Sequence, residues 1–273
     1  MEFLAQFFDF RAFLLLALVF IPLEQLLPER ADQKVFRRGW LNDLVYVLFN
    51  GILIRVGLLV VIVAIVMLSD WIIPAGFKAA VAAQPIWLQA GELIILADLG
   101  FYGMHRLFHA VPLLWRFHAV HHSIEEMDWL AGHRVHPVDQ ILTKAASMVP
   151  CFALGFSEWA IAIYFIIYSW HSVLLHANTR LSFGPLRWLI ASPAFHHWHH
   201  ANQREAYDKN FAAQLPLWDL IFKTSHMPAG EVPERYGVDD PVPATYIEQL
   251  VYPFRDDPRR ADAPLPPAQA DTE

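Results

Sequence analysis

Histidines in three short clusters are the residues of this chain with the clearest potential for chemistry. They stand in the runs HRLFH, HAVHH and HHWHH. Residues three or four apart share one face of a helix, so each cluster directs imidazoles from one rigid support. Neutral imidazole is the commonest metal-ligating side chain and binds iron, zinc, copper or nickel. The clusters therefore predict a metal centre with these candidate ligands: His105, His109, His118, His121, His122, His196, His199 and His200.

The composition indicates a membrane protein. The chain has 273 residues, of which 56% are hydrophobic and only 17% are charged, and this is too apolar for an ordinary soluble domain. Its net charge is −7 and no basic pattern suits nucleic acid, so a nucleic-acid partner is not expected. The single cysteine, Cys151, excludes an internal disulfide and a thiolate-rich metal site.

Four apolar segments predict the membrane-associated helices. They cover residues 13–27, 41–68, 86–102 and 141–175, to be compared with the roughly 20 residues that cross the hydrocarbon layer. The first is short and spans only if the apolar residues from Phe3 to Phe10 extend it. It lacks the features of a cleaved secretory signal, so we expect it to remain as an anchor.

The fourth apolar segment is interrupted near Gly155, Ser157 and Glu158. Glycine and serine at such a position favour a break between two helices. This segment therefore predicts either a helical hairpin or one span followed by a re-entrant piece.

The connecting loops predict the orientation, because Lys and Arg concentrate on the cytoplasmic side of short connections. The loop between the first two spans carries Arg30, Lys34, Arg37 and Arg38, whereas the next loop carries only Lys78. The first loop is therefore expected to be cytoplasmic. Counting the spans forward then brings all three histidine clusters to the cytoplasmic face.

These patterns together predict the fold class and its divisions. We expect an all-α integral membrane protein with about four membrane-spanning or re-entrant helices and a cytoplasmic helical cap that holds a histidine-rich metal site. Residues 1–96 are expected to form N-terminal membrane helices, 97–224 the histidine-bearing domain, and 225–273 a C-terminal extension. The end of that extension, from about Asp256, is rich in Pro, Ala and Asp and is expected to be disordered.

The motifs resemble the fatty acid hydroxylase and sterol desaturase superfamily. The likeness covers about residues 97–224 and includes Asp98 and Tyr102 in ADLGFYGMHR, His136 and Pro137 in GHRVHPVD, and the closing stretch NFAAQLPLWDLIFKT. In that family the clustered histidines hold two metal ions, taken to be iron, and the centre uses O2 and two electrons to hydroxylate or desaturate a lipid. The resemblance implies that the metal site of the cap is a dimetal site and that the eight clustered histidines ligate two such ions, with no catalytic residue beyond the ligands.

Two further histidines occupy the family's intervening position. His171 and His176 are five residues apart and so lie about 140° apart on a regular helix. His176, where the helix is expected to stop, is predicted to be a ninth ligand. His171 is either a further ligand or a structural residue.

Groups around the ligands should orient them, because a metal-bound histidine usually donates its other ring N–H to a carboxylate or carbonyl. The nearby carboxylates are Asp98, Asp128, Asp139 and Asp219. Asp98 has the strongest case, because an ionisable group near a membrane span is costly and usually functional; pairing with Arg55 is its alternative. The predicted supporting residues are Asp98, His136, His197 and Asp219.

The resemblance also implies a substrate and a partner. The substrate would be a membrane lipid, of the sterol, fatty acyl, sphingolipid, ether lipid or carotenoid class, and hydroxylation and desaturation stay open. It would enter between the spans, along a path for which the apolar candidates are Ile161, Ile163, Phe165, Ile166 and Trp170. No haem-binding, flavin or dinucleotide motif appears, so electrons are expected from a separate ferredoxin- or cytochrome-type donor with its reductase.

Two other classes of function fit histidines near a membrane. A lipid hydrolase with zinc-bound water is chemically possible, and zinc can substitute for iron at such ligands. Catalytic zinc usually needs only three protein ligands, however. A metal transporter would place its histidines at mid-bilayer rather than at the ends of spans.

Overall fold

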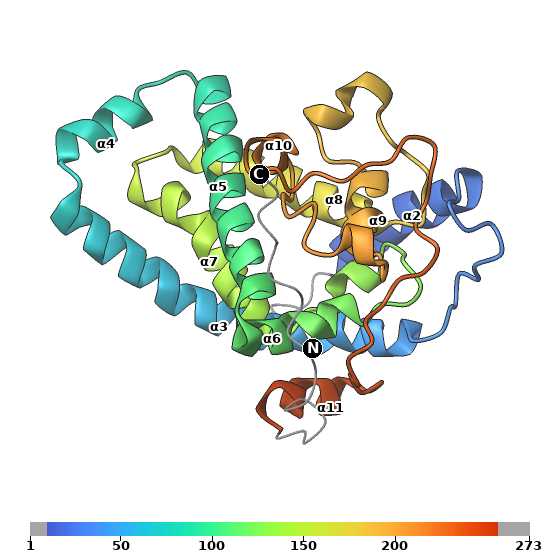
Figure 1. The fold of residues 1–273 in the computed structure, drawn as a ribbon. Coiled ribbons are helices and arrows are strands. Elements are labelled where there is room, and N and C mark those ends of the chain that lie inside the picture. The colour runs from blue at the N-terminus through green and yellow to red at the C-terminus, as the bar shows by residue number, and fades with distance from the viewer. Residues whose placement is uncertain (1–9, 256–273) are drawn as a thin grey trace, which may run out of the picture.

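Helices and loops make up the part of the chain that the computed structural model describes, residues 10–255 (Figure 1). Within these residues no strand forms, and one isolated bridge pairs Ala201 with Tyr236. The all-α prediction is confirmed. The possible extension of the first span over residues 3–9 and the tail 256–273 lie outside the described residues.

Two described helices are long and apolar enough to cross a membrane, α3 (Trp40–Ile72) and α8 (Glu158–His176). A third span is possible if α4 (Ala75–Ala82) and α5 (Ile86–Ala110), which meet at 116°, act as one broken span. The remaining predicted segments fold as α2 (Phe10–Leu26) and α7 (Pro137–Ala153), each of 17 residues. At about 1.5 Å per residue, the described length of each helix is less than a bilayer thickness of about 30 Å.

The predicted break in the fourth apolar segment separates α7 from α8. Gly155 has φ 91°, and a Cβ added there would lie 2.6 Å from the Cβ of Lys78, so only glycine fits. The hydroxyl of Ser157 then accepts a hydrogen bond from the backbone N–H of Ala160 and caps α8.

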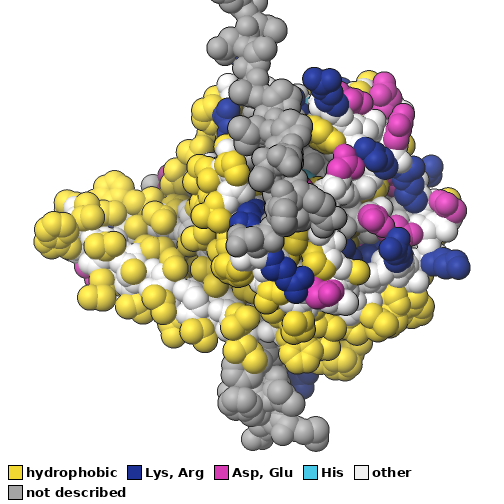
Figure 2. Space-filling model, turned by 60° about the horizontal axis from the view of Figure 1, so that its bottom comes forward, with side chains coloured by type: hydrophobic (Ala, Val, Ile, Leu, Met, Phe, Trp, Pro, Cys, Tyr) yellow, Lys and Arg dark blue, Asp and Glu magenta, His cyan; other side chains and the backbone are white. Residues whose placement is uncertain are grey.

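An elongated arm carries much of the exposed apolar surface. Figure 1 shows α3, α4 and α5 forming this arm, and Figure 2 shows it covered with hydrophobic side chains while charged ones gather on the rest of the molecule. Trp71 and Met67, for example, are 85% and 68% exposed. Surface of this kind is stable in contact with lipid and not with water.

Shorter helices among the remaining described residues form a cap against the ends of these helices. The cap is built from α6 (Pro112–His122), α9 (Pro193–His199), α10 (Leu217–Ile221) and α11 (Tyr246–Val251), with short 3-10 turns η1 (Ala131–His133), η2 (Gly184–Trp188), η3 (Arg204–Ala206) and η4 (Tyr252–Phe254). In α6 and α9, as in α7, proline occupies the first turn, where its missing N–H leaves no hydrogen bond unmade.

A buried ionic network ties the cap to α3. Asp43, in the first turn of α3, lies 2.6 Å from the guanidinium of Arg37 and 2.5 Å from Nε of Arg134. The same Arg37 nitrogen contacts Asp128 at 2.6 Å. The loop before α3 and the loop after α6 are therefore fixed together, directly beside the histidine clusters.

Candidate metal centre

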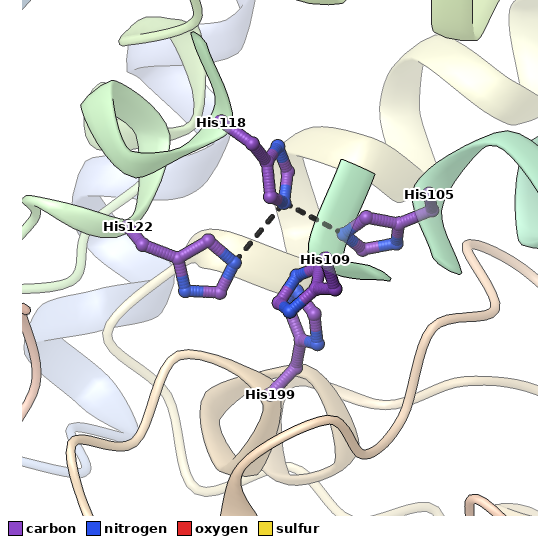
Figure 3. Close-up of side chains that lie close together, drawn as sticks. All are labelled: His105, His109, His118, His122 and His199. Carbon is purple, nitrogen blue, oxygen red and sulfur yellow. Dashed lines mark hydrogen bonds between the residues drawn. The ribbon is translucent and has the colours of Figure 1, made fainter. Parts of the chain in front are cut away.

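Nine of the predicted ligands come together in two adjoining groups. Within each group, one ligand nitrogen per residue lies within 4.8 Å of all the others. The rings of His122 and His200 stack across the boundary between the groups, with centroids 4.5 Å apart. The five-histidine group is His105, His109, His118, His122 and His199 (Figure 3), and the four-histidine group is His121, His176, His196 and His200.

The helical register divides the clusters between the two groups. Clustered histidines four residues apart belong to the same group, as His118 and His122 on α6 do. Their neighbour His121, displaced by about 100° on the helix, serves the other group. Each of the HAVHH and HHWHH runs therefore bridges both groups, and α6 and α9 hold the two groups at a fixed separation.

Most of the grouped rings are fixed by a hydrogen bond at Nδ1. In four of them Nδ1 donates to a backbone carbonyl oxygen, which can only accept. The acceptors are Phe211 for His105 at 2.7 Å, Arg134 for His121 at 3.0 Å, Ser172 for His176 at 2.8 Å, and Lys209 for His199 at 2.7 Å. These bonds place the ring proton on Nδ1 and leave Nε2 as a bare lone pair.

The Nε2 atoms nevertheless approach one another closely. Nε2 of His121 lies 3.2 Å from Nε2 of His176, although both rings hold their proton at Nδ1. Nε2 of His105 likewise lies 2.9 Å from Nε2 of His118 (Figure 3). Two lone pairs this close repel unless a cation lies between them, so the arrangement suits a bound metal ion.

The spacing of these nitrogens also suits a metal. Ligands at right angles around an ion, each about 2.1 Å away, lie about 3 Å apart. The Nε2 separations are 3.0 Å for His176 and His196 and 3.1 Å for His196 and His200. Nε2 of His109 and of His199 is buried without any hydrogen-bond partner among the described residues. Both groups therefore fit the donor set of one metal ion each.

Burial keeps these imidazoles neutral. It lowers the pKa of His118, His122 and His199 in the five-histidine group well below the usual value of about 6.5, and nearby histidines lower it further. The pKa of His121, His196 and His200 in the other group is lowered in the same way. Neutral imidazole is the form that binds metal.

Two carboxylates contact the five-histidine group directly. Asp139 accepts from Nδ1 of His118 at 2.8 Å, and Asp208 accepts from Nδ1 of His109 at 3.3 Å. Asp139 was one of several candidates in the sequence, whereas nothing in the sequence singles out Asp208. It lies 99 residues from its histidine and can be found only in the folded chain.

Asp98 and Asp219 act on the backbone rather than on a histidine ring. Asp98 accepts the N–H groups of Ala213, Gln214 and Leu215, at 2.8 to 3.0 Å. Asp219 accepts the N–H groups of Phe211 and Ala212, at 2.9 and 2.8 Å. Together they hold residues 211–215 in place, and this segment supplies the carbonyl that orients His105.

Three other predicted residues lie outside both groups. Nε2 of His171 contacts the carbonyl of Ala191 at 2.7 Å. His136 caps α7 through Nδ1, and its Nε2 meets the carbonyl of Leu250 at 3.1 Å. His197 is fully buried and pairs through Nδ1 with Glu29 at 2.7 Å, so it ties α9 to the loop after α2.

Comparison with known proteins agrees with this geometry. Residues 92–224 match the family model described as fatty acid hydroxylase. The chain carries a fatty acid hydroxylase domain. This match confirms the superfamily recognised from the motifs, and the domain contains all nine grouped histidines. No solved structure shows significant similarity to the chain.

Several enzymes are similar to this chain. It is 29% identical to the ornithine lipid hydroxylase OlsE of Rhizobium tropici over 62% of this chain and 51% of that protein. It is 31% identical to the human alkylglycerol monooxygenase over 53% of this chain and 32% of that protein. It is 30% identical to the fatty acid hydroxylase vlmA of Lecanicillium over 48% of this chain and 40% of that protein. The chain thus spans about half or less of each of these relatives.

Proposed function

We propose that this protein is an O2-dependent membrane oxidoreductase that hydroxylates or desaturates a lipid at a centre of two iron ions. One ion would be held by the five-histidine group and the other by the four-histidine group. Iron bound there would supply the redox chemistry with O2 that attacks an unactivated C–H bond, which side chains alone cannot do. Zinc would occupy the same nitrogens without supporting that chemistry.

The observation that carries the proposal is the close approach of Nε2 atoms across helices. The contact between His105 and His118 joins α5 to α6, and the contact between His176 and His196 joins α8 to α9. The rings of His105, His118 and His176 are each held by an Nδ1 partner, so their donor atoms are oriented before any ion binds. Such preorganisation favours a tightly held, buried centre.

The contacts of the basic loop support a cytoplasmic position for the cap. Arg37 and Arg38, which predict a cytoplasmic loop, contact Asp128 and Glu126 in the loop that follows α6. The basic loop and the histidine groups therefore lie at the same side of the molecule. We propose a multi-pass protein whose centre faces the cytoplasm.

The proposed reaction needs two partners. The names of the similar enzymes favour a lipid substrate that reaches the centre from the membrane. The chain contains no motif for a flavin, haem or nicotinamide cofactor, which favours a separate ferredoxin- or cytochrome-type electron donor with its reductase.

Metal exchange tests the proposal. The purified protein, stripped with a chelator and reloaded with iron or with zinc, is given membrane lipid, O2 and a reductant. We expect two iron ions per chain and O2 consumption, together with a lipid product that has gained one oxygen atom or lost two hydrogen atoms. The zinc-loaded protein should be inert. Turnover of a lipid ester or amide by the zinc form, with no O2 consumed, would instead establish a hydrolase.

A further inference from the structure

A cavity of about 280 Å³ lies between α2, η1, α7 and α8. Leu15 and Leu16 of α2 and Trp170 and Val173 of α8 form apolar parts of its wall. Of the sequence-predicted path residues, only Trp170 borders it. A mostly apolar wall with a few polar groups is typical of ligand sites, and the volume is slightly below the usual range for such pockets, about 300 to 1,000 Å³.

Four polar side chains border this cavity without a partner. Lys144 and Gln140 come from α7, Tyr168 from α8 and His133 from η1. Among residues 10–255 none of the four side chains has a hydrogen-bond or ion-pair partner, and Nε2 of His133 is fully buried. A buried polar atom without a partner, such as Nε2 of His133, is costly and calls for an explanation.

The charge at this cavity is positive. Lys144 is its only ionised group, because no Asp or Glu borders it among the described residues. The nearest buried carboxylates are already engaged: Asp139 with His118 and Thr143, and Asp43 with Arg37 and Arg134. A ligand carrying a negative oxygen group would therefore meet a cation that no carboxylate of residues 10–255 neutralises.

The cavity shares a wall with the four-histidine group. Gly132 borders the cavity, and a Cβ added to it would lie 2.8 Å from Cγ of His176. Ser172 also borders the cavity, and its carbonyl orients the same ring. On the other side Tyr168 contacts Phe101, whose ring lies 5.2 Å from that of His105. A molecule seated here would lie beside the proposed centre.

We propose that this cavity binds the anionic end of a long-chain amphiphile, a carboxylate or phosphate, with Lys144 as the positioning residue and His133, Gln140 and Tyr168 as further hydrogen-bonding groups. The volume holds a polar end and the first part of a chain, and the remainder would extend along α2 and α8 into the bilayer. That this ligand is the substrate rests on the proposed function; that it binds here does not.

Photolabelling of the full-length protein in phosphatidylcholine nanodiscs tests the site. The probes are a long-chain fatty acid with a diazirine close to its carboxylate, its methyl ester, and a lysophosphatidic acid with a diazirine at the same position. Peptide mass spectrometry should place the fatty acid label on residues 12–16, 132–144 or 168–173. The neutral methyl ester should label these segments about tenfold less, since a charge-assisted hydrogen bond is lost.

Lys144→Met removes the charge and keeps the length of the side chain. It should reduce labelling by the acid about tenfold, to the level of the ester, while Lys144→Arg should retain most of it. Lys78→Met is the matched control, because Lys78 pairs with Asp70 away from the cavity. Efficient labelling by lysophosphatidic acid but not by the fatty acid would identify a phosphate as the recognised group. Equal labelling by acid and ester, or unchanged labelling of Lys144→Met, would overturn the site.

These measurements need neither iron nor O2, so they separate the two proposals. Charge-selective labelling without any lipid oxidation by the iron-loaded protein would keep this binding site and reject the oxygenase. Lipid oxidation by the iron-loaded protein, together with equal labelling by acid and ester, would keep the oxygenase and reject this site.

Discussion

Asp139 accepts a hydrogen bond from Nδ1 of His118 at 2.8 Å, and both side chains are buried. The bond fixes the ring so that Nε2 faces His105 and His122. Asp139 is itself held by the hydroxyl of Thr143 at 3.0 Å. One α7 carboxylate thus orients the central histidine of the five-histidine group.

Asp139→Ala should weaken metal binding to this group. Loss of a carboxylate that hydrogen-bonds to a metal-bound histidine typically lowers the metal affinity about 10–100-fold. Asp139→Asn, which keeps an acceptor oxygen, should lose less. Metal content after dialysis against a graded series of chelator concentrations measures the effect. Equal retention by wild type and Asp139→Ala would show that the carboxylate does not support a bound metal.

His199→Ala and His197→Ala should have different effects on metal content and stability, although the two residues are only two positions apart. His199 belongs to the five-histidine group, so its loss should release one of two metals. His197 pairs with Glu29 outside both groups, so His197→Ala should keep both metals and lower the melting temperature instead. Elemental analysis and thermal unfolding distinguish the two effects. Equal metal loss in both variants would contradict the assignment of the HHWHH run.

Metal affinity should be nearly constant from pH 8 to pH 6. A free imidazole takes up a proton near pH 6.5 and then cannot bind metal. Burial lowers the pKa of His121 and His199 well below that value, so protons compete with metal only at lower pH. Competition with a chelator whose own pH dependence is known provides the measurement. A steep fall in affinity that begins at pH 7 would mean that the ligands titrate like exposed histidines.

Gly132→Ala should disturb the four-histidine group selectively. The added methyl group would lie 2.8 Å from Cγ of His176, closer than side-chain atoms pack, so the ring must move. We expect loss of one metal per chain. Gly103→Ala on α5 is the control, because its added Cβ meets nothing within 4 Å. If both variants keep two metals, His176 is not a required ligand.

Asp43→Ala should destabilise the protein strongly. It leaves Arg37 and Arg134 buried without their shared carboxylate, and breaking a buried pair in this way costs about 3–5 kcal/mol. The carbonyl of Arg134 orients His121, so metal binding should weaken as well. Asp70→Ala, at an exposed ion pair with Lys78, should change stability by about 0.5 kcal/mol or less. Comparable unfolding midpoints for the two variants would argue against a structural role for the network.

Local patterns in the sequence are sufficient to predict the helical fold class, the break between helices near Gly155 and the histidines that share a helix face. These features depend on residues a few positions apart, through backbone conformation and helical periodicity. The recognised motifs likewise identify the family, whose model matches residues 92–224. The division of the whole chain at residues 96 and 224, and the ligation itself, stay predictions.

Only the tertiary structure decides how the histidines are shared. His121 and His122 are neighbours in sequence but belong to different groups, because α6 passes between partners on α5, α8 and α9. The structure also separates His176, whose Nε2 meets His121 and His196, from His171, which meets a carbonyl. The acceptors that orient the rings are largely main-chain oxygens, as with Phe211, 106 residues from His105. Every residue type carries that oxygen, so sequence cannot mark it, and only long-range packing brings it to the site.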